Sequence, residues 1–321
     1  MYSLTTEISQ QQVKKVIQNI EKVIIGKTEV ARLSIVALLA EGHVLLEDVP
    51  GLGKTMLVKA LAKSVDADFK RIQFTPDLLP SDVLGVSIYN PKEMAFSFRP
   101  GPIVGNIVLA DEINRTSPKT QSALLEAMEE KSVTIDGATL HMEKPFFVMA
   151  TQNPVEYEGT YPLPEAQLDR FLLKLKMGYP EANEEVELLT RVQKVPPIDY
   201  LEPVISLEEL RHLQRQVKDI FAEETIKQYI VDLAIKTRSH PDIFLGISPR
   251  GSIALLKAAQ AYAFISGRDF IIPDDVQYLA PYVFSHRILL QSEAKYRGVS
   301  AESLIGELVK SVDIPVKRAV K

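Results

Sequence analysis

The sequence predicts an α/β protein: a parallel sheet of five strands with helices on both faces, followed by a smaller all-helical domain. Within about the first 177 residues, short apolar runs alternate with amphipathic segments, which is typical of a parallel sheet covered on both sides. After Pro196-Pro197, every clear apolar pattern has helical spacing. We therefore expect an α/β domain over residues 1–195 and a helical domain over residues 196–321.

Five short segments are expected to form the sheet. Ile107–Ala110 and Phe146–Ala150 are nearly continuous apolar runs, as expected of strands buried on both faces. The expected strands are residues 43–47, 70–74, 107–110, 146–150 and 171–175.

The helices of the first domain are predicted from apolar spacing and from their end signals. Gly42 ends one of them, and Ser117-Pro118 begins another, with Ser as the N-cap and Pro in the first turn. The expected helices are residues 8–22, 30–39, 56–62, 118–128, 166–170 and 181–192. In the second domain, Ser206 and Glu209 form a capping box. Further helices are expected from residue 223, from Ser248-Pro249, from 273 and from 300.

Two hairpins are expected to interrupt the first domain. Residues 75–106 are rich in Pro and Gly and hold two short strand-like runs around a turn at 90–93, and Asp136-Gly137 predicts a second hairpin within 131–142. Phe96 and Phe98 have two open interpretations: they contact a partner, or, as we favour, they pack the hairpin onto its own domain.

The composition is that of a globular protein of 321 residues, with 46% hydrophobic and 25% charged residues. The net charge of −5 argues against sequence-independent nucleic-acid binding, which needs a basic face. Cys is absent, which excludes disulfides, thiolate nucleophiles and zinc–thiolate sites and fits a reducing cytosol. There is no signal-peptide pattern and no apolar run of about 20 residues, so we expect a cytoplasmic protein without a membrane span.

The residues Pro50-Gly51-Leu52-Gly53-Lys54-Thr55 lie between an expected strand and an expected helix. That context is typical of a phosphate-binding loop, in which backbone N–H groups and the start of the helix face an anion. Lys54 would reach the β- and γ-phosphates, and the Thr55 hydroxyl would bind Mg²⁺. The pattern departs from the usual one at Asp48, where a glycine is common. The alternative, a glycine-rich turn that binds nothing, is disfavoured by the flanking strand and helix.

Polar residues follow two other expected strands. Asp111-Glu112 comes after the strand 107–110, and Asn153 comes after 146–150. Ligands of parallel α/β sheets lie outside the carboxyl ends of the strands, so these residues are expected beside the phosphate loop. Asp111 would hold Mg²⁺, Glu112 would polarise the attacking water, and Asn153 would orient that water or contact the γ-phosphate.

These motifs resemble those of the AAA+ ATPases, and of the MoxR family in particular. The similarity covers about residues 13–290, and Asp48 also occurs in that family's loop. The segments that carry it are residues 46–55, 71–82, Asp111-Glu112-Ile113-Asn114-Arg115, Ala150-Thr151-Gln152-Asn153-Pro154, residues 164–171 and Ser248-Pro249-Arg250-Gly251.

The resemblance implies further site residues. Arg170 matches an arginine finger supplied to the neighbouring subunit's ATP, and Arg250 matches a sensor-2 arginine that closes from the lid onto the γ-phosphate. The alternatives are that Arg170 is a surface cation at a helix end, where the helix dipole favours it, and that Arg250 is a solvated residue in the first turn of a helix, where the dipole disfavours it. The implied cofactors are ATP and Mg²⁺, with nucleotide contacts from Ile25, Gly26, Pro50, Gly51, Leu52, Gly53, Lys54, Thr55 and Met56.

The resemblance also implies a function: ATP hydrolysis in a ring homo-oligomer, by family likeness a hexamer, that remodels or matures partner proteins. The usual clients carry von Willebrand factor A domains, and the two hairpins would act on partners. Two alternatives stay open. One is a nucleic-acid motor such as a helicase or clamp loader, which the acidic net charge disfavours. The other is a small-molecule kinase, which would need an acceptor pocket in place of the helical lid.

Overall fold

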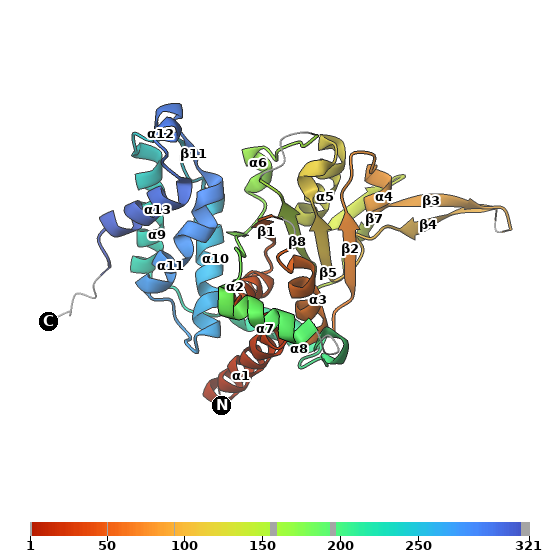
Figure 1. Ribbon diagram of the computed structural model, residues 1–321, viewed down its shortest axis with the longest axis horizontal. Coiled ribbons are helices and arrows are strands. Elements are labelled where there is room, and N and C mark those ends of the chain that lie inside the picture. The colour runs from red at the N-terminus through yellow and green to blue at the C-terminus, as the bar shows by residue number, and fades with distance from the viewer. Residues whose placement is uncertain (1, 50, 93, 155–158, 193–196, 316–321) are drawn as a thin grey trace.

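A computed structural model describes residues 2–49, 51–92, 94–154, 159–192 and 197–315. Its centre is a five-stranded sheet in the order β2-β5-β8-β1-β9 in which every pair is parallel, as the sequence predicted. The bounds are β1 Val44–Glu47, β2 Phe69–Gln73, β5 Ile107–Asp111, β8 Phe147–Gln152 and β9 Leu173–Leu175. Figure 1 shows this sheet beside a separate group of helices.

Alternating residues of the strands face two hydrophobic cores. Val44 and Leu46 of β1 pack into a core with α1–α3, whereas Leu45 between them packs into a second core with α5. A strand places successive side chains on opposite faces, so one apolar run supplies both cores. The helices are α1 Tyr2–Glu21, α2 Thr28–Leu39, α3 Lys54–Ser64, α5 Pro118–Glu130, α6 Glu165–Leu168 and α7 Ala182–Val192.

The second part is helical, as predicted, with one addition. A short antiparallel pair, β10 (Ile243–Leu245) with β11 (Leu289–Leu290), joins its helices and was not expected from the helical spacing. The predicted capping box at Ser206 is present, with Ser206 accepting from the Glu209 N–H. The helices are α8 Leu207–Lys218, α9 Glu224–Ser239, α10 Pro249–Ile265, α11 Pro273–Phe284, α12 Ser292–Tyr296 and α13 Ala301–Ser311.

The two parts share one apolar core, because α10 packs directly on α2. Polar contacts add to it: the hydroxyls of Tyr278 and Tyr282 on α11 each donate to Glu29 on α2 at 2.8 Å. The lid is therefore fixed against the start of the chain. The division at residue 195/196 falls within 193–196, outside the described residues, and stays a proposal.

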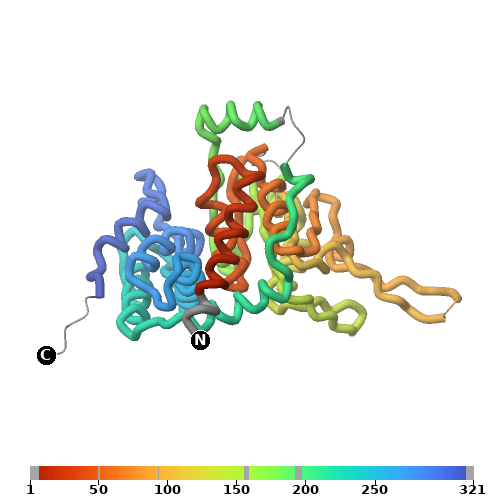
Figure 2. The backbone as a smooth tube through the Cα atoms, turned by 90° about the horizontal axis from the view of Figure 1, so that it is seen from below, coloured from red at the N-terminus to blue at the C-terminus, as the bar shows by residue number. Residues whose placement is uncertain are grey.

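Both predicted hairpins form: β3 (Gly85–Asn90) with β4 (Ala95–Pro100), and β6 (Ser132–Ile135) with β7 (Ala138–His141). A one-turn helix that the sequence did not indicate, α4 (Pro80–Leu84), precedes the first. Figures 1 and 2 show β3–β4 as an arm that extends away from the sheet. The expectation that Phe96 packs this arm onto its own domain is wrong, because Phe96 is 74% exposed and its ring contacts Tyr89 of the same hairpin.

Across the described ranges, none of the helices combines the length and the apolar character that crossing a lipid bilayer requires.

Candidate active site

The phosphate loop, Asp111-Glu112 and Asn153 meet at one edge of the sheet. They follow β1, β5 and β8, which are adjacent parallel strands, so their carboxyl ends lie together. A cavity of about 250 Å³ opens there. It is lined by Gly51, Gly53, Lys54, Thr55, Arg71, Gln73, Asp111, Glu112 and Asn153. All but Arg71 and Gln73 were predicted site residues. Pro50, a further predicted one, lies outside the described residues.

Two glycines give the loop its shape. Gly51 and Gly53 have φ angles of 88° and 85°, a region that residues with a Cβ rarely adopt. A Cβ at either position would meet no atom within 4 Å, so the requirement is conformational rather than one of space. Gly53 is the N-cap of α3, which directs the unpaired N–H groups of that helix toward the cavity.

Lys54 and Asp48 fasten the loop. The Lys54 ammonium donates to the Asp48 carbonyl at 2.8 Å, and its burial lowers its pKa, against the nearby carboxylates that raise it. The Asp48 carboxylate accepts from the backbone N–H groups of Met177 and Gly178, just beyond β9. Asp48, the departure from the usual loop pattern, therefore ties the loop to the neighbouring strand's end.

The acidic pair is held by a buried residue that sequence reasoning did not single out. The Thr151 hydroxyl donates to Asp111 Oδ1 at 2.7 Å and accepts from the Glu112 N–H at 2.8 Å. Glu112 has a φ of 59°, which is uncommon for a residue with a side chain and occurs mainly where surrounding contacts enforce it. The one signal in the sequence that could have pointed to Thr151 was its position near the end of β8, two residues before Asn153.

Arg71 and Gln73 of β2 are the other residues that sequence reasoning missed. Arg71 Nη2 lies 2.7 Å from Asp111 Oδ2 and 2.7 Å from Gln73 Oε1, and Gln73 donates to Glu112 Oε2 at 2.9 Å. Both lie on one face of the edge strand, two residues apart. Only the pairing of β2 with β5, where Gln73 is opposite Asp111, brings them to the site.

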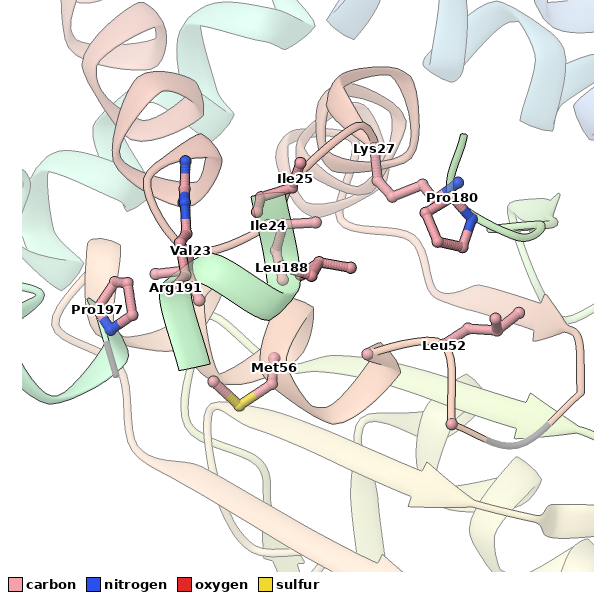
Figure 3. A pocket seen from close by; sticks show the side chains of 12 residues that line it. Val23, Ile24, Ile25, Lys27, Leu52, Met56, Pro180, Leu188, Arg191 and Pro197 are labelled. Atoms are coloured by element: carbon pink, nitrogen blue, oxygen red, sulfur yellow. The ribbon is translucent and has the colours of Figure 1, made fainter. Parts of the chain in front are cut away.

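A second cavity of about 330 Å³ adjoins the loop and is mostly apolar (Figure 3). Its walls include the predicted loop contacts Gly51, Leu52, Gly53 and Met56 and three residues of the segment 23–26, which the family resemblance placed at the adenine: Val23, Ile24 and Ile25. The lining residues that were not predicted are Lys27, Pro180, Leu188, Arg191 and Pro197. An apolar cavity beside a phosphate loop suits the planar ring of a nucleotide base. The predicted contact Gly26 does not line it; a Cβ there would lie about 2.1 Å from the Glu184 carboxyl.

The two predicted arginines lie elsewhere, in a third cavity of about 200 Å³. Arg170 Nε and Arg250 Nη1 contact the two oxygens of Glu129 at 2.7 and 3.1 Å. This cavity is also lined by Gly42 and His43, which precede β1, whereas the phosphate loop follows β1. Four strand residues separate the two, or about 13 Å.

This geometry corrects the expectation that Arg250 closes onto the phosphates of its own chain. The first turn of α10 carries Arg250, and α10 packs on α2. That packing places Arg250 beside Arg170 at the amino-terminal ends of the strands, whereas the loop lies at their carboxyl ends.

A buried arginine anchors this cluster. Arg287 Nε donates to Asp169 Oδ1 at 2.6 Å, and its other nitrogens donate to the backbone carbonyls of Phe171 and Leu172, just before β9. Its side chain is 3% exposed, and burial lowers its pKa to about 10, which still leaves it charged at neutral pH. Arg287 therefore links the lid to the sheet next to Arg170 and Arg250.

The donor set fits magnesium bound together with phosphates. Within the part of the chain that the structure describes, no three His, Cys, Asp or Glu residues gather to hold a metal alone. Mg²⁺ usually takes one or two protein oxygens and completes its shell with phosphates and waters. Thr55 and Asp111 line one cavity and can supply these oxygens.

A phosphate loop, an acidic pair at the end of a neighbouring strand and a helical lid define the class of AAA+ ATPases. Residues 43–173 match the family described as "ATPase family associated with various cellular activities (AAA)", and residues 235–308 match the AAA lid domain. The chain binds nucleotide and hydrolyses ATP, as that family does.

The uncharacterized protein YeaC of Bacillus subtilis is 65% identical over 95% of each chain. Chaperone MoxR1 of Mycobacterium tuberculosis is 41% identical, over 96% of this chain and 83% of its own. The crystal structure of a candidate ATPase from Cytophaga hutchinsonii has a TM-score of 0.91 at 39% identity and covers 97% of each chain. The protein belongs to the MoxR family.

Proposed function

We propose that the protein works as a ring in which each ATP is held by one subunit and completed by its neighbour, and that hydrolysis drives remodelling of partner proteins. The observation that carries this proposal is that the phosphate cavity and the cluster of Arg170 and Arg250 lie at opposite ends of the strands of one sheet. Such a surface pair joins subunits head to tail, which closes into a ring.

In the proposed site, the loop N–H groups and Lys54 bind the β- and γ-phosphates, and Thr55 with Asp111 holds magnesium. Magnesium, when bound, neutralises charge on the phosphate oxygens. Glu112, fixed through its backbone by Thr151, orients and deprotonates the attacking water, and Asn153 directs that water at the γ-phosphate. The adenine base of the nucleotide lies in the apolar cavity beside Met56 and Leu188.

Arg170 and Arg250 complete the neighbour's site. The transition state of phosphoryl transfer spreads negative charge over the γ-phosphate oxygens, and an arginine aimed at it contributes about 10³–10⁵ in rate. Both guanidinium groups now contact Glu129, so the neighbour's phosphates would have to compete with that carboxylate for them. The pairing keeps the two cations together and oriented before assembly.

The partner role rests on relatives. One close relative is named a chaperone, and two further relatives carry the name MoxR. We propose clients with von Willebrand factor A domains and a hexameric ring, by family likeness. The exposed β3–β4 arm, with Phe96 and Met94 in solvent, is a surface on which such clients would be engaged.

Dilution tests the proposal. The specific ATPase activity should fall as the protein is diluted below the concentration at which it assembles, because Arg170 then faces no nucleotide. The Glu112→Gln variant, which should bind ATP without turnover, gives the background rate, and light scattering reports assembly in the same samples. A specific activity that stays constant down to monomeric concentrations would contradict a site shared between subunits.

A further inference from the structure

We propose that Arg71 is a positioning residue that occupies Oδ2 of Asp111 when no metal is bound, and so sets how strongly nucleotide binding depends on magnesium. The inference rests on the proposed function of this site, because it concerns the same phosphate cavity. It assigns a role to a residue of β2 outside the phosphate loop, the acidic pair and the arginine cluster.

Asp111 has little capacity left for a metal in this arrangement. Its Oδ2 lies 2.7 Å from Arg71 Nη2 and 3.3 Å from Arg71 Nε, and its Oδ1 accepts from the Thr151 hydroxyl. Two N–H groups fill the two lone-pair sites of Oδ2. A cation bound there also repels a second one. The Arg71 guanidinium would therefore have to leave Oδ2 before this oxygen could serve as a magnesium ligand, directly or through water.

The Arg71 side chain is free to leave. It is 47% exposed, whereas Asp111 is 14% exposed and is fixed by Thr151. Exposed ion pairs contribute little free energy, so the displacement is inexpensive. Arg71 lines the same cavity as Lys54 and Thr55, so the guanidinium remains within reach of the phosphates after it leaves Asp111.

Arg71 also balances the charge of the cavity when no metal is present. The lining of the cavity includes two cations, Lys54 and Arg71, and two anions, Asp111 and Glu112. Gln73 connects Arg71 to Glu112, so one guanidinium orients both carboxylates. Without Arg71, Lys54 would be the one cation left among the lining residues, and phosphate binding would need the metal more.

The experiment measures the dissociation constant of a fluorescent ADP analogue, mant-ADP, in EDTA and in saturating Mg²⁺. ADP is used so that hydrolysis plays no part. For Arg71→Gln, the ratio of the two constants (EDTA over Mg²⁺) should rise by roughly five- to tenfold over the wild-type ratio, because in EDTA the Asp111 and Glu112 carboxylates then oppose the diphosphate without the Arg71 charge, whereas Mg²⁺ supplies positive charge in the other condition. Arg71→Lys, which keeps the charge without the fork, should fall between the two.

Arg115→Gln is the matched control. Arg115 is 44% exposed and pairs with Glu112 at 3.2 Å, but it does not line the cavity. Its removal should change the ratio by less than about twofold. A ratio for Arg71→Gln within twofold of wild type, a lower ratio, or an equal rise in Arg115→Gln would overturn the role of Arg71. A wild-type protein that binds no mant-ADP under either condition would instead remove the nucleotide site itself, and the inference with it.

Discussion

At the scale of single residues, the buried His43 connects β8 to α5 at the amino-terminal end of β1, opposite the phosphate loop. Its Nδ1 accepts from the Val148 N–H at 3.0 Å, so the proton is on Nε2, which faces the Met128 carbonyl at 3.2 Å. Burial lowers the pKa of His43 from its ordinary value of 6.5 to about 4. The ring is therefore neutral in the folded protein at any pH above that value.

This neutral histidine predicts a loss of stability in acid. Below pH 6.5 the unfolded chain binds a proton at His43 that the folded chain refuses until about pH 4, so the stability falls as the pH drops through this window. The full loss is about 3 kcal/mol, and about 2 kcal/mol is gone by pH 5.

Calorimetric unfolding of the wild type and His43→Gln at pH 7.5 and pH 5 tests this. The variant should lose about 2 kcal/mol less than the wild type over that interval. The pKa of His286 is also lowered by burial, but it titrates in both proteins and cancels in the difference. An identical pH dependence in the two proteins would show that His43 is not the group responsible.

Single residues also mark the limit of sequence reasoning at the site. Lys54, Thr55, Asp111, Glu112 and Asn153 were predicted because each sits in a local pattern at a strand end, and the structure brings all of them to one cavity. Their supporting partners Thr151, Arg71 and Gln73 were missed. These reach the acidic pair only across neighbouring strands, and nothing within a short window of sequence specifies that pairing.

At the scale of elements, the contact between the lid and β9 depends on Arg287. Its guanidinium contacts one carboxylate and several backbone carbonyls, and the whole side chain is buried. Removing this donor would leave several buried carbonyls without a hydrogen-bond partner, which is costly. The orientation of the lid is therefore more sensitive to Arg287 than to any exposed ion pair on the same domain.

Replacing Arg287 with Met, which has no charge, should destabilise the protein by roughly 3–5 kcal/mol, because the buried carbonyls of Phe171, Leu172 and Val283 lose their donor and the half-buried Asp169 loses its nearest cation. Thermal unfolding followed by calorimetry measures the effect. Arg297→Met is the control: Arg297 pairs with Asp242 at the surface, so the cost should be at most about 1 kcal/mol. Equal losses in the two variants would contradict the importance of the buried network.

The elements themselves were largely predictable, and their exceptions have physical causes. Strands, capped helices and both hairpins follow from local spacing and turn residues, and the structure has them. The short pair β10–β11 was missed because two- and three-residue strands carry no period. Phe96 was misjudged because an apolar strand pattern is the same whether the hairpin lies on its domain or extends from it.

At the scale of the whole molecule, the position of the lid decides where Arg250 acts. The sequence places Arg250 in the first turn of a capped helix, but the direction of that helix depends on packing between α10 and α2, more than 200 residues apart in the chain. Such long-range packing is not encoded in any local pattern. The structure sets Arg250 beside Arg170 and leaves the phosphate cavity of the same chain without either arginine.

The central claim is that the ATPase site is shared between subunits, and mixing two inactive variants tests it most directly. Glu112→Gln keeps Arg170 but lacks the base, and Arg170→Ala keeps the base but lacks the finger, so each alone should lose at least about 10²-fold in activity. In mixed rings, an Arg170→Ala subunit whose neighbour is Glu112→Gln regains a complete site.

In an equal mixture with random order, about half of the subunits carry the base and about half of their neighbours carry the finger. The mixture should therefore recover about a quarter of the wild-type specific activity. A mixture that co-assembles, as judged by co-purification of differently tagged variants, yet is no more active than either variant alone would contradict the shared site.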